Sequence, residues 1–196
     1  AWIAQRNGRT KDGNDVTDQG IIKMFCMSCA EDKIKAIDDL HIVPIAVSYE
    51  WEPCDVLKTL ELYESQFSKY TKKPGEDLNS ILTGIVQEKG RVHFELCEPL
   101  SYAELSKFDG LTNNDYHKQV ARLIDRRIRA AYRLYPNNYI AYDLRYGTTK
   151  YKHCYTVAEK EAFLKRLQTL EQYDTCDVDK LKDIFLGIYS NPVNNK

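Results

Sequence analysis

The spacing of hydrophobic residues predicts short helices and strands in alternation over the first hundred residues. Apolar side chains recur at helical spacing over 21–30 and again over 34–40. Residues 41–51 form a nearly continuous apolar run rich in β-branched side chains, which is typical of a strand buried on both faces. Pro44 within that run favours a bulge or the start of the strand.

The same alternation continues beyond this run. A helix is predicted over 53–66 and a shorter one over 77–87. Residues 91–97 alternate between apolar and polar side chains, which indicates a half-buried strand. Its inward side chains are expected to be Val92, Phe94 and Leu96. Residues 2–5 have the pattern of the end of another strand, so the first hundred residues predict an α/β layer.

From about residue 101 the pattern is that of helices alone. Residues 113–115 are expected to cap a long helix that reaches Tyr135, where Pro136 ends it. Two further amphipathic helices are predicted over 157–172 and 177–189. The fold class expected is therefore α/β: a partial mixed sheet with flanking helices, followed by a helical C-terminal region.

The change of pattern divides the chain into one half of an α/β domain over 1–100 and a helical extension over 101–196. A chain of 196 residues suits one domain, or one domain with a helical appendage. The formal net charge of −1 gives no support to general binding of polyanions. Any anion site must therefore be local, and we expect no nucleic-acid partner.

The cysteines and the lack of a long apolar run in the sequence bear on the cellular location of the protein. No run approaches the roughly 20 apolar residues that cross a bilayer, and no signal peptide is visible. The first residue is Ala rather than Met, which leaves open an anchor or a targeting segment upstream. Most of the cysteines lie in or beside apolar segments, which favours reduced thiols and a cytoplasmic location.

The candidate chemistry lies at the start of the chain. Residues 6–13 form a glycine-flanked basic turn directly after a short apolar run. Glycine lets the backbone turn its N–H groups inward, and the cations add charge and a planar guanidinium. A helix follows, and its dipole also favours an anion. The turn predicts a clamp for phosphate or carboxylate; an ordinary surface loop is the alternative, because Asn-Gly and Asp-Gly are common turn dipeptides.

Three blocks of sequence carry a resemblance to a known family. Gly8-Arg9-Thr10-Lys11-Asp12-Gly13 resembles the Glu-Gly-(Thr/Gly)-Arg-Ser-Arg-x-Gly block of the glycerolipid acyltransferases, which acylate glycerol-3-phosphate and lysophosphatidic acid. Residues 42–47 are similar to that family's next block, an apolar strand with an embedded proline. Residues 90–94 are similar to its following Gly-(Lys/Arg)-Val strand. Among that family, the chain resembles the larger, Bacteroides-type members, whose helical C-terminal extension would account for residues 101–196.

The resemblance implies a role for each residue of the first block. Gly8, Arg9, Thr10 and Lys11 would hold the phosphate of the acceptor, with Arg9 as the main contact. Asn7 stands where the family typically has Glu. Its amide can hydrogen-bond a glycerol hydroxyl, but it cannot supply a negative charge. The implied acyl donor is acyl-CoA or acyl carrier protein, and no metal or other cofactor is implied.

The family's catalytic His-x4-Asp box has no match in this chain. The residues five positions after the histidines are Ala46, Glu98, Arg122 and Ala158. The resemblance therefore implies a general-base histidine upstream and no catalytic residue here. We expect the chain alone to be inactive, releasing no thiol from acyl-CoA and lysophosphatidate. The intact protein is expected at the cytoplasmic face of a membrane, as a peripheral protein, because its product is a lipid.

A pair of cysteines and a row of arginines each allow two interpretations. Cys26-x-x-Cys29 suggests a redox or zinc half-site, but no second pair follows at zinc spacing, which favours ordinary buried thiols. A row of arginines over 122–133 either meets anionic lipid or RNA, or forms a solvated helix face paired with Asp125 and neighbouring acids. The alternative to an enzyme is a non-catalytic module, in which the anion loop and this helix recruit a lipid headgroup or RNA.

Overall fold

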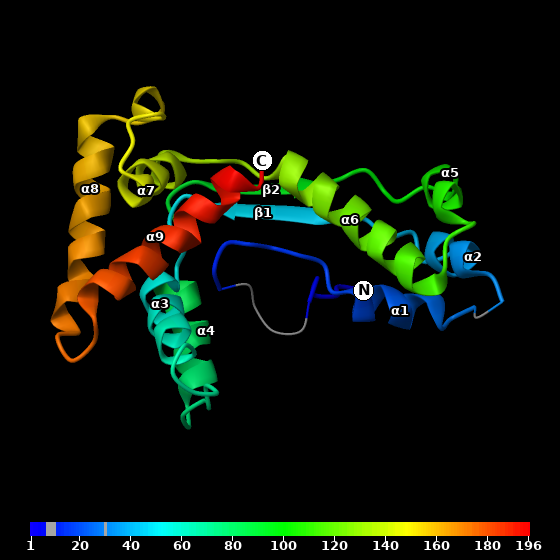
Figure 1. Cartoon of the computed structure of the whole chain (residues 1–196), viewed down its shortest axis with the longest axis horizontal. Coiled ribbons are helices and arrows are strands. Elements are labelled where there is room, and N and C mark those ends of the chain that lie inside the picture. The colour runs from blue at the N-terminus through cyan, green and yellow to red at the C-terminus, as the bar shows by residue number, and fades with distance from the viewer. Residues whose placement is uncertain (7–10, 30) are drawn as a thin grey trace. The chain divides into compact units, whose positions relative to one another are not determined.

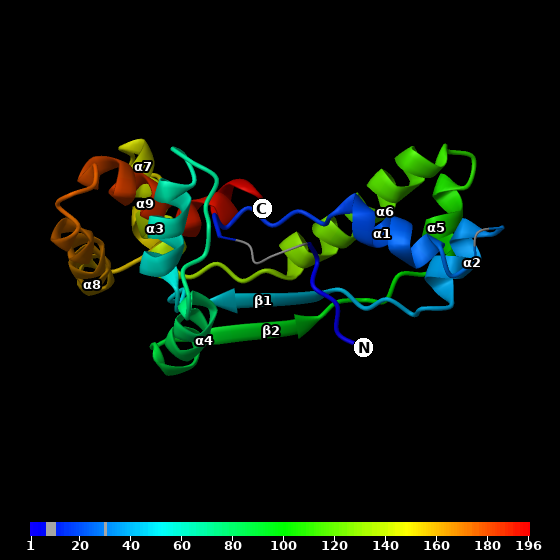
Figure 2. The same ribbon diagram turned by 90° about the horizontal axis from the view of Figure 1, so that it is seen from below.

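The computed structural model describes residues 1–6, 11–29 and 31–196, and it confirms the mixed α/β class. The fold is 57% helical and has a small antiparallel sheet of two strands (Figures 1 and 2). The strands are β1 (Ile45–Tyr49) and β2 (Val92–Leu96). The helices are α1 (Gln19–Cys26), α2 (Lys33–Asp38), α3 (Asp55–Glu64), α4 (Glu76–Val86), α5 (Tyr102–Leu105), α6 (Asn113–Ala131), α7 (Pro136–Tyr146), α8 (Val157–Gln168) and α9 (Val178–Asn194).

Strands β1 and β2 run in opposite directions beside each other (Figure 2). At one end of the pair the Cys97 backbone N–H donates to the Pro44 carbonyl over 2.9 Å. At the other end the Glu50 N–H donates to the Arg91 carbonyl, also over 2.9 Å. Pro44 therefore lies just before β1, where its missing N–H costs no bond inside the strand.

The expected burial of β2 is wrong. Val92, Phe94 and Leu96 are 51%, 56% and 64% exposed instead of facing a core. Alternation shows only that one face of a strand is apolar; whether a second layer covers that face is decided by the rest of the fold. In the sheet that the described residues form, β2 has β1 as its neighbour on one side.

The strand expected at residues 2–5 is also wrong, since no regular structure forms there. Trp2 and Ile3 are 70% and 58% exposed. The Gln5 carbonyl instead accepts a hydrogen bond from the Asp18 backbone N–H at 3.0 Å. A strand needs a neighbour to pair its backbone groups along its length, and this single bond joins the segment to a loop rather than to a sheet.

The chain forms two compact units, each assembled from separate stretches of sequence. The first unit draws on residues 1–9, 15–47 and 94–132, and its core lies among α1, α2, α5 and α6. The fully buried side chains of that core include Ile22, Ile37, Leu105, Tyr116 and Val120. Its longest helix, α6, begins after Thr112, whose hydroxyl accepts a hydrogen bond from the Asp115 N–H and so caps the helix.

The expected end of α6 is displaced. The helix stops at Ala131 instead of Tyr135, and Pro136 opens α7. A residue before proline is pushed out of the helical region, and Tyr135 is accordingly extended (φ −116°, ψ 165°). The same proline suits the first position of a helix, where a backbone donor is not needed. Pro136 therefore separates two helices rather than simply ending one.

The second unit draws on residues 10–14, 48–93 and 133–196, and α9 lies at its centre, against α7 and α3. Phe163, Phe185 and Leu181 are fully buried in its core, and the Trp51 ring stacks on Phe163 with centroids 5.9 Å apart. This aromatic packing is part of the apolar core of the unit. The two units are distinguished by compactness, and each contains residues from both sides of residue 100. The expected domains, 1–100 and 101–196, therefore stay a prediction.

A buried carboxylate links three helices of the second unit. Asp55, at the start of α3, is fully buried and accepts hydrogen bonds from the Arg166 guanidinium of α8 at 2.6 and 3.1 Å. It also accepts one from the Tyr189 hydroxyl of α9 at 2.8 Å. The pKa of Arg166 is raised by its hydrogen bond to Asp55, and burial raises the pKa of Tyr189 well above its usual value. A buried charge held by two partners of this kind fixes the register of the helices that carry them.

Candidate functional site

The ends of the segment that contains the first sequence block are tied together. The Asp18 N–H donates to the Gln5 carbonyl at 3.0 Å, so the two residues that flank segment 6–17 are joined by a backbone hydrogen bond. Asn7, Gly8, Arg9 and Thr10 lie outside the described residues, and their assignments as site residues stay predictions. The geometry of the site is therefore built from the residues that flank them.

Asp125 of α6 holds both ends of this loop. Its Oδ1 accepts hydrogen bonds from the Thr17 N–H at 2.8 Å, the Thr17 hydroxyl at 2.6 Å and the Gln5 side-chain amide at 3.0 Å. Gln5 also donates to the Thr17 hydroxyl at 3.0 Å. Asp125 and Thr17 are only 7% and 5% exposed. Hydrogen bonds from a backbone N–H, a hydroxyl and an amide to one buried carboxylate make a rigid base for the loop, because each donor would lose its partner if the loop moved.

The sequence did not reveal this use of Asp125. The pattern suggested that Asp125 pairs with the arginines of the same helix, whereas it faces the loop. The available signal was its position: Leu123, Ile124 and Asp125 are consecutive buried residues, and an acid beside an apolar helix face needs donors from another segment. Spacing alone does not tell which segment supplies them.

Two of the arginines on α6 are engaged within the first unit. Arg127 Nη2 lies 2.7 Å from both carboxylate oxygens of Glu104. Arg129 donates to the Asp15 carbonyl at 3.2 Å. The pKa of Glu104 is lowered, first by the Ser101 hydroxyl and then by Arg127, although burial opposes the shift. Arg127 thus pairs with Glu104 where Asp125 was expected as the partner, and Arg129 bonds a backbone carbonyl rather than an acid.

The second half of the loop, residues 11–14, belongs to the second unit. The Lys11 ammonium is paired with the Glu61 carboxylate of α3. Asn191 of α9 donates to the Asp12 carbonyl at 2.7 Å. Gly13 has φ +71°, and a Cβ at this position would collide with the Ile188 carbonyl. Lys11 thus has a protein carboxylate as its partner. Its contact with a substrate phosphate stays a prediction, and that contact requires the Lys11 ammonium to bind the phosphate and Glu61 together.

The second and third blocks of the resemblance lie side by side. Residues 42–47 contain most of β1, residues 90–94 contain most of β2, and the two strands form the sheet. The Glu50 carboxylate accepts hydrogen bonds from the Arg91 N–H at 2.9 Å and from its guanidinium at 2.7 and 3.1 Å. These bonds lower the pKa of Glu50, against the effect of its burial. Arg91 is therefore used to close the strand pair.

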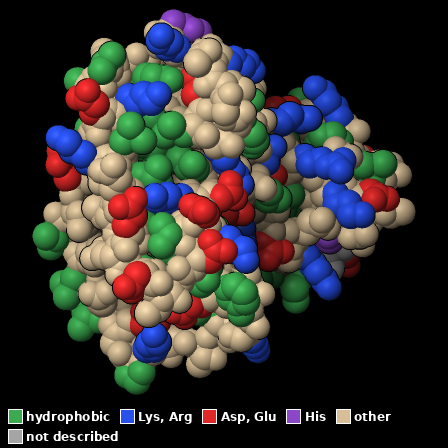
Figure 3. Space-filling model, turned by 60° about the vertical axis from the view of Figure 1, so that its left-hand side comes forward, with side chains coloured by type: hydrophobic (Ala, Val, Ile, Leu, Met, Phe, Trp, Pro, Cys, Tyr) green, Lys and Arg blue, Asp and Glu red, His purple; other side chains and the backbone are tan. Residues whose placement is uncertain are grey.

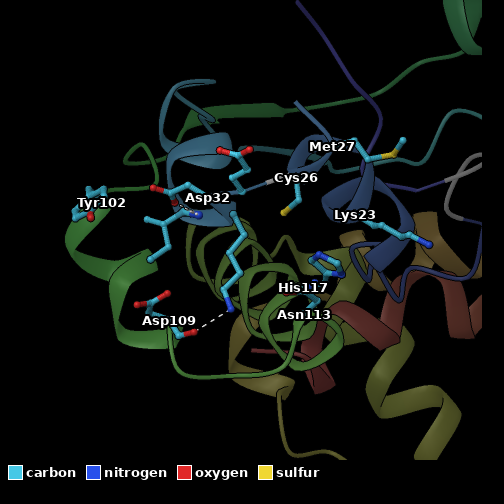
Figure 4. A pocket seen from close by; sticks show the side chains of 11 residues that line it. Lys23, Cys26, Met27, Asp32, Tyr102, Asp109, Asn113 and His117 are labelled. Carbon is cyan, nitrogen blue, oxygen red and sulfur yellow. Dashed lines mark hydrogen bonds between the residues drawn. The ribbon is translucent and has the colours of Figure 1, made fainter. Parts of the chain in front are cut away.

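A polar pocket of about 540 Å³ lies among α1, α2 and α6 of the first unit (Figure 4). Cys26 and His117 both border it. Burial raises the pKa of the Cys26 thiol, partly opposed by Lys33, and lowers the pKa of His117, with Lys23 and Lys33 adding to the effect. A protonated thiol and a neutral imidazole are the forms expected near pH 7, so Cys26 is not an activated nucleophile.

Lys33 adds charge to the edge of this pocket, but its amine is occupied. It donates to the backbone carbonyls of Asp109 and Leu111 at 2.9 and 2.8 Å and lies 5.1 Å from the centre of the Tyr116 ring. Figure 4 shows the bond to Asp109. The Lys33 ammonium is thus committed to the fold, and we assign no chemistry to the pocket.

The cysteines give no sign of a metal or disulfide centre. Cys26 and Cys29 are half-buried rather than fully buried, and the cysteines, all of which the structure describes, form no disulfide. Within residues 1–6, 11–29 and 31–196, no cluster of three or more His, Cys, Asp or Glu side chains is arranged to hold a metal ion. In the same part of the chain, no helix combines the length and the hydrophobicity needed to span a bilayer.

No family model, curated protein or solved structure matches this chain.

Proposed function

We propose that this chain is the acceptor-binding part of a glycerolipid acyltransferase with an acyltransferase-like α/β fold. The observation that carries the proposal is the ordered set of three blocks, of which the second and third are neighbouring strands. The second and third blocks are distant in sequence, resemble consecutive strand motifs of one family and also pair in space. This combination favours a common architecture over a chance match of short motifs. The loop that contains the first block has a base fixed by Asp125, as a substrate-binding loop requires.

The reaction of the intact protein would join a fatty acyl group to a hydroxyl of glycerol phosphate or a lysophospholipid. An alcohol is a poor nucleophile near neutral pH and needs a positioned base. The base, a histidine outside this chain, takes the hydroxyl proton; the oxygen attacks the thioester carbonyl, and the thiol of CoA or acyl carrier protein leaves with a proton. Arg9, with Gly8, Thr10 and Lys11, holds the acceptor's phosphate so that the reacting hydroxyl stays in place. Asn7 hydrogen-bonds a glycerol hydroxyl.

The location follows from the product. An acylated glycerol phosphate is a membrane lipid, so the intact enzyme would work as a peripheral protein at the cytoplasmic face of the membrane. The alternative is a non-catalytic module, in which the same loop and the basic helix α6 recruit a lipid headgroup or RNA. The engagement of Arg127 and Arg129 within the first unit favours the acyltransferase over this module.

The first test measures binding of sn-glycerol 3-phosphate to this chain by isothermal titration calorimetry. We expect binding that Arg9→Ala weakens by about tenfold or more, because a charge-assisted contact to phosphate is lost. Arg122→Ala is the matched control, since it removes the same charge from an exposed position on α6. Glycerol, which lacks the phosphate, should not bind. Equal loss in the two variants would contradict the assignment of Arg9.

The second measurement uses the intact protein and follows thiol release from acyl-CoA in the presence of lysophosphatidate. Arg9→Ala should raise the KM for the phosphorylated acceptor far more than the KM for the acyl donor. The chain described here should release no thiol, since it contains no His-x4-Asp box. Robust turnover by this chain, or an equal effect of Arg9→Ala on both substrates, would overturn the proposed mechanism.

A further inference from the structure

Helix α4 turns its large hydrophobic side chains away from the protein. They follow the helical spacing i, i+3, i+4, i+7 and i+8, so they form one continuous stripe along the helix. Leu82 is the most covered of them at 52% exposed, and Val86 is the most exposed at 80%. The members of this stripe are Leu78, Ile81, Leu82, Ile85 and Val86.

The opposite side of α4 packs on the second unit through small residues. Ser80 is 8% exposed, and its carbonyl accepts a hydrogen bond from the Cys54 thiol at 3.5 Å. The same sulfur lies beside Gly84, one turn further along the helix. An ordinary surface helix buries its apolar face and exposes its polar one. In α4 the small residues Ser80 and Gly84 face inward and the stripe faces outward, so packing within the described chain does not explain the hydrophobicity of this helix.

Lysines stand at both ends of the stripe. Before α4, residues 68–75 form an exposed loop that contains Lys69, Lys72 and Lys73. After it, Lys89 donates to the carbonyls of Ile85 and Gln87 and so caps the end of the helix. Long cationic side chains beside an apolar stripe match a helix lying in a membrane surface, where the stem stays apolar and the ammonium reaches the headgroups. The lysines of the loop before α4 can take this position, whereas the Lys89 ammonium is bound to backbone carbonyls.

Two acidic groups, Glu76 and Asp77, are held at the first turn of α4 and lie off the stripe, and the exposed Glu88 follows the end of the helix. Asp77 pairs with Lys72 at 2.6 Å. Glu76 accepts a hydrogen bond from the Lys73 N–H at 3.0 Å, and its pKa is lowered by the Tyr70 hydroxyl and this bond. Both carboxylates lie at the helix N-terminus, where the dipole favours them. Of the lysines in this loop, Lys69 and Lys73 form no ion pair within the part of the chain that the structure describes.

We infer that α4 lies flat in the surface of an anionic lipid bilayer, with its apolar stripe among the acyl chains and the lysines of the preceding loop at the headgroups. The inference rests on the proposed function, because an enzyme whose product is a membrane lipid needs access to the bilayer. A second copy of the chain would also cover an apolar stripe, but it gives no reason for the group of lysines in the loop before it. The bilayer accounts for the stripe and the lysines together.

The test is co-sedimentation of the chain with vesicles of phosphatidylcholine containing about 30 mol% phosphatidylglycerol. We expect the unmodified chain to sediment with these vesicles. The triple variant Leu82→Ser/Ile85→Ser/Val86→Ser should lose about tenfold or more in partition, because the side chains that enter the acyl region are gone. Vesicles of phosphatidylcholine alone should bind the chain more weakly, and Lys69→Gln/Lys73→Gln should remove that difference.

A matched pair of single variants separates the stripe from general hydrophobicity. Val86 is 80% exposed on α4 and Val157 is 75% exposed at the start of α8, so the same change to Ser removes the same apolar group from equally open positions. Val86→Ser should weaken vesicle binding and Val157→Ser should not. Far-ultraviolet circular dichroism checks that each variant keeps its helix content.

Two results would overturn the inference. One is equal sedimentation of the triple variant and the unmodified chain. The other is an unmodified chain that does not sediment with the vesicles. If that chain also forms a dimer that the triple variant dissociates, the stripe belongs to a contact between copies. Titration with glycerol 3-phosphate in vesicle-free buffer is independent of α4. A chain that binds glycerol 3-phosphate but not vesicles would refute the membrane inference alone, and the reverse result would refute the proposed acceptor site alone.

Discussion

At the scale of single residues, Asp125 is the side chain on which the geometry of the candidate loop depends most. Asp125→Ala should lower the free energy of unfolding by about 2–4 kcal/mol, because the Thr17 N–H and hydroxyl and the Gln5 amide lose a buried acceptor. Asp125→Asn keeps one carbonyl oxygen and should lose roughly half as much. Urea denaturation followed by circular dichroism measures both changes.

The control for Asp125 lies on the same helix. Asp115 is exposed in the first turn of α6, so Asp115→Ala should cost less than about 1 kcal/mol. Under conditions where all variants are folded, Asp125→Ala should also weaken glycerol 3-phosphate binding, Asp125→Asn should restore part of it, and Asp115→Ala should leave it unchanged. Full affinity in a folded Asp125→Ala variant would show that the base of the loop does not position the site.

At the scale of elements, the join between β2 and the loop before it depends on a glycine. Gly90 has φ +60°, and a Cβ there would lie 2.6 Å from the Glu50 carboxylate that closes the strand pair. Gly90→Ala should therefore destabilise the chain by about 1–3 kcal/mol, through the strained backbone and the displaced Glu50–Arg91 bonds. The change is measured by thermal and urea unfolding.

Two other glycines separate the cost of backbone strain from the cost of the collision with Glu50. Gly75 has φ +81° with open space around its Cβ position, so Gly75→Ala carries the backbone strain without the collision. Gly110 has open space and no positive φ, so Gly110→Ala should be neutral or slightly stabilising. The expected order of destabilisation is Gly90, then Gly75, then Gly110. If Gly90→Ala costs no more than Gly75→Ala, Glu50 is not held where we place it.

Most elements could be predicted from the sequence because their signals are local. The helices at 19–26, 33–38 and 76–86 follow apolar spacing and recognisable starts, and β1 and β2 follow runs of β-branched or alternating residues. The burial of β2 could not be predicted, since it depends on what lies over Phe94 and not on Phe94 itself. The same holds for the stripe of α4: its spacing indicates an amphipathic helix, but not that the helix packs through its small residues.

The candidate site was predictable in part, and for the same reason. The glycine-flanked basic turn is a local pattern, so its position before α1 and its glycine with positive φ at Gly13 are consistent with the sequence. The partners of its flanks, Asp125 and Glu61, are more than 40 positions away along the chain. Such contacts depend on how α3 and α6 fold back, and nothing in the composition of the turn specifies them.

At the scale of the whole molecule, charge distinguishes the acyltransferase from the RNA-binding module. The net charge is −1, and acidic and basic side chains are interspersed on the face in Figure 3. RNA binding without sequence preference requires several phosphate contacts by free cations. On α6, Arg127 and Arg129 are already engaged by Glu104 and the Asp15 carbonyl, which leaves the exposed Arg122 and Arg126 as candidates for such contacts.

We therefore expect no measurable binding of a single-stranded RNA of about 20 nucleotides at about 150 mM salt, by fluorescence anisotropy. At about 50 mM salt, any residual binding should be weak, because two exposed arginines on α6 release few counterions. Micromolar binding that falls steeply with salt and disappears in Arg122→Ala/Arg126→Ala would favour the module. In that case the basic turn would serve a polyanion, and glycerol 3-phosphate should compete with RNA for it. If RNA does not bind while glycerol 3-phosphate does, the anion site is local and small, as a chain with almost no net charge requires.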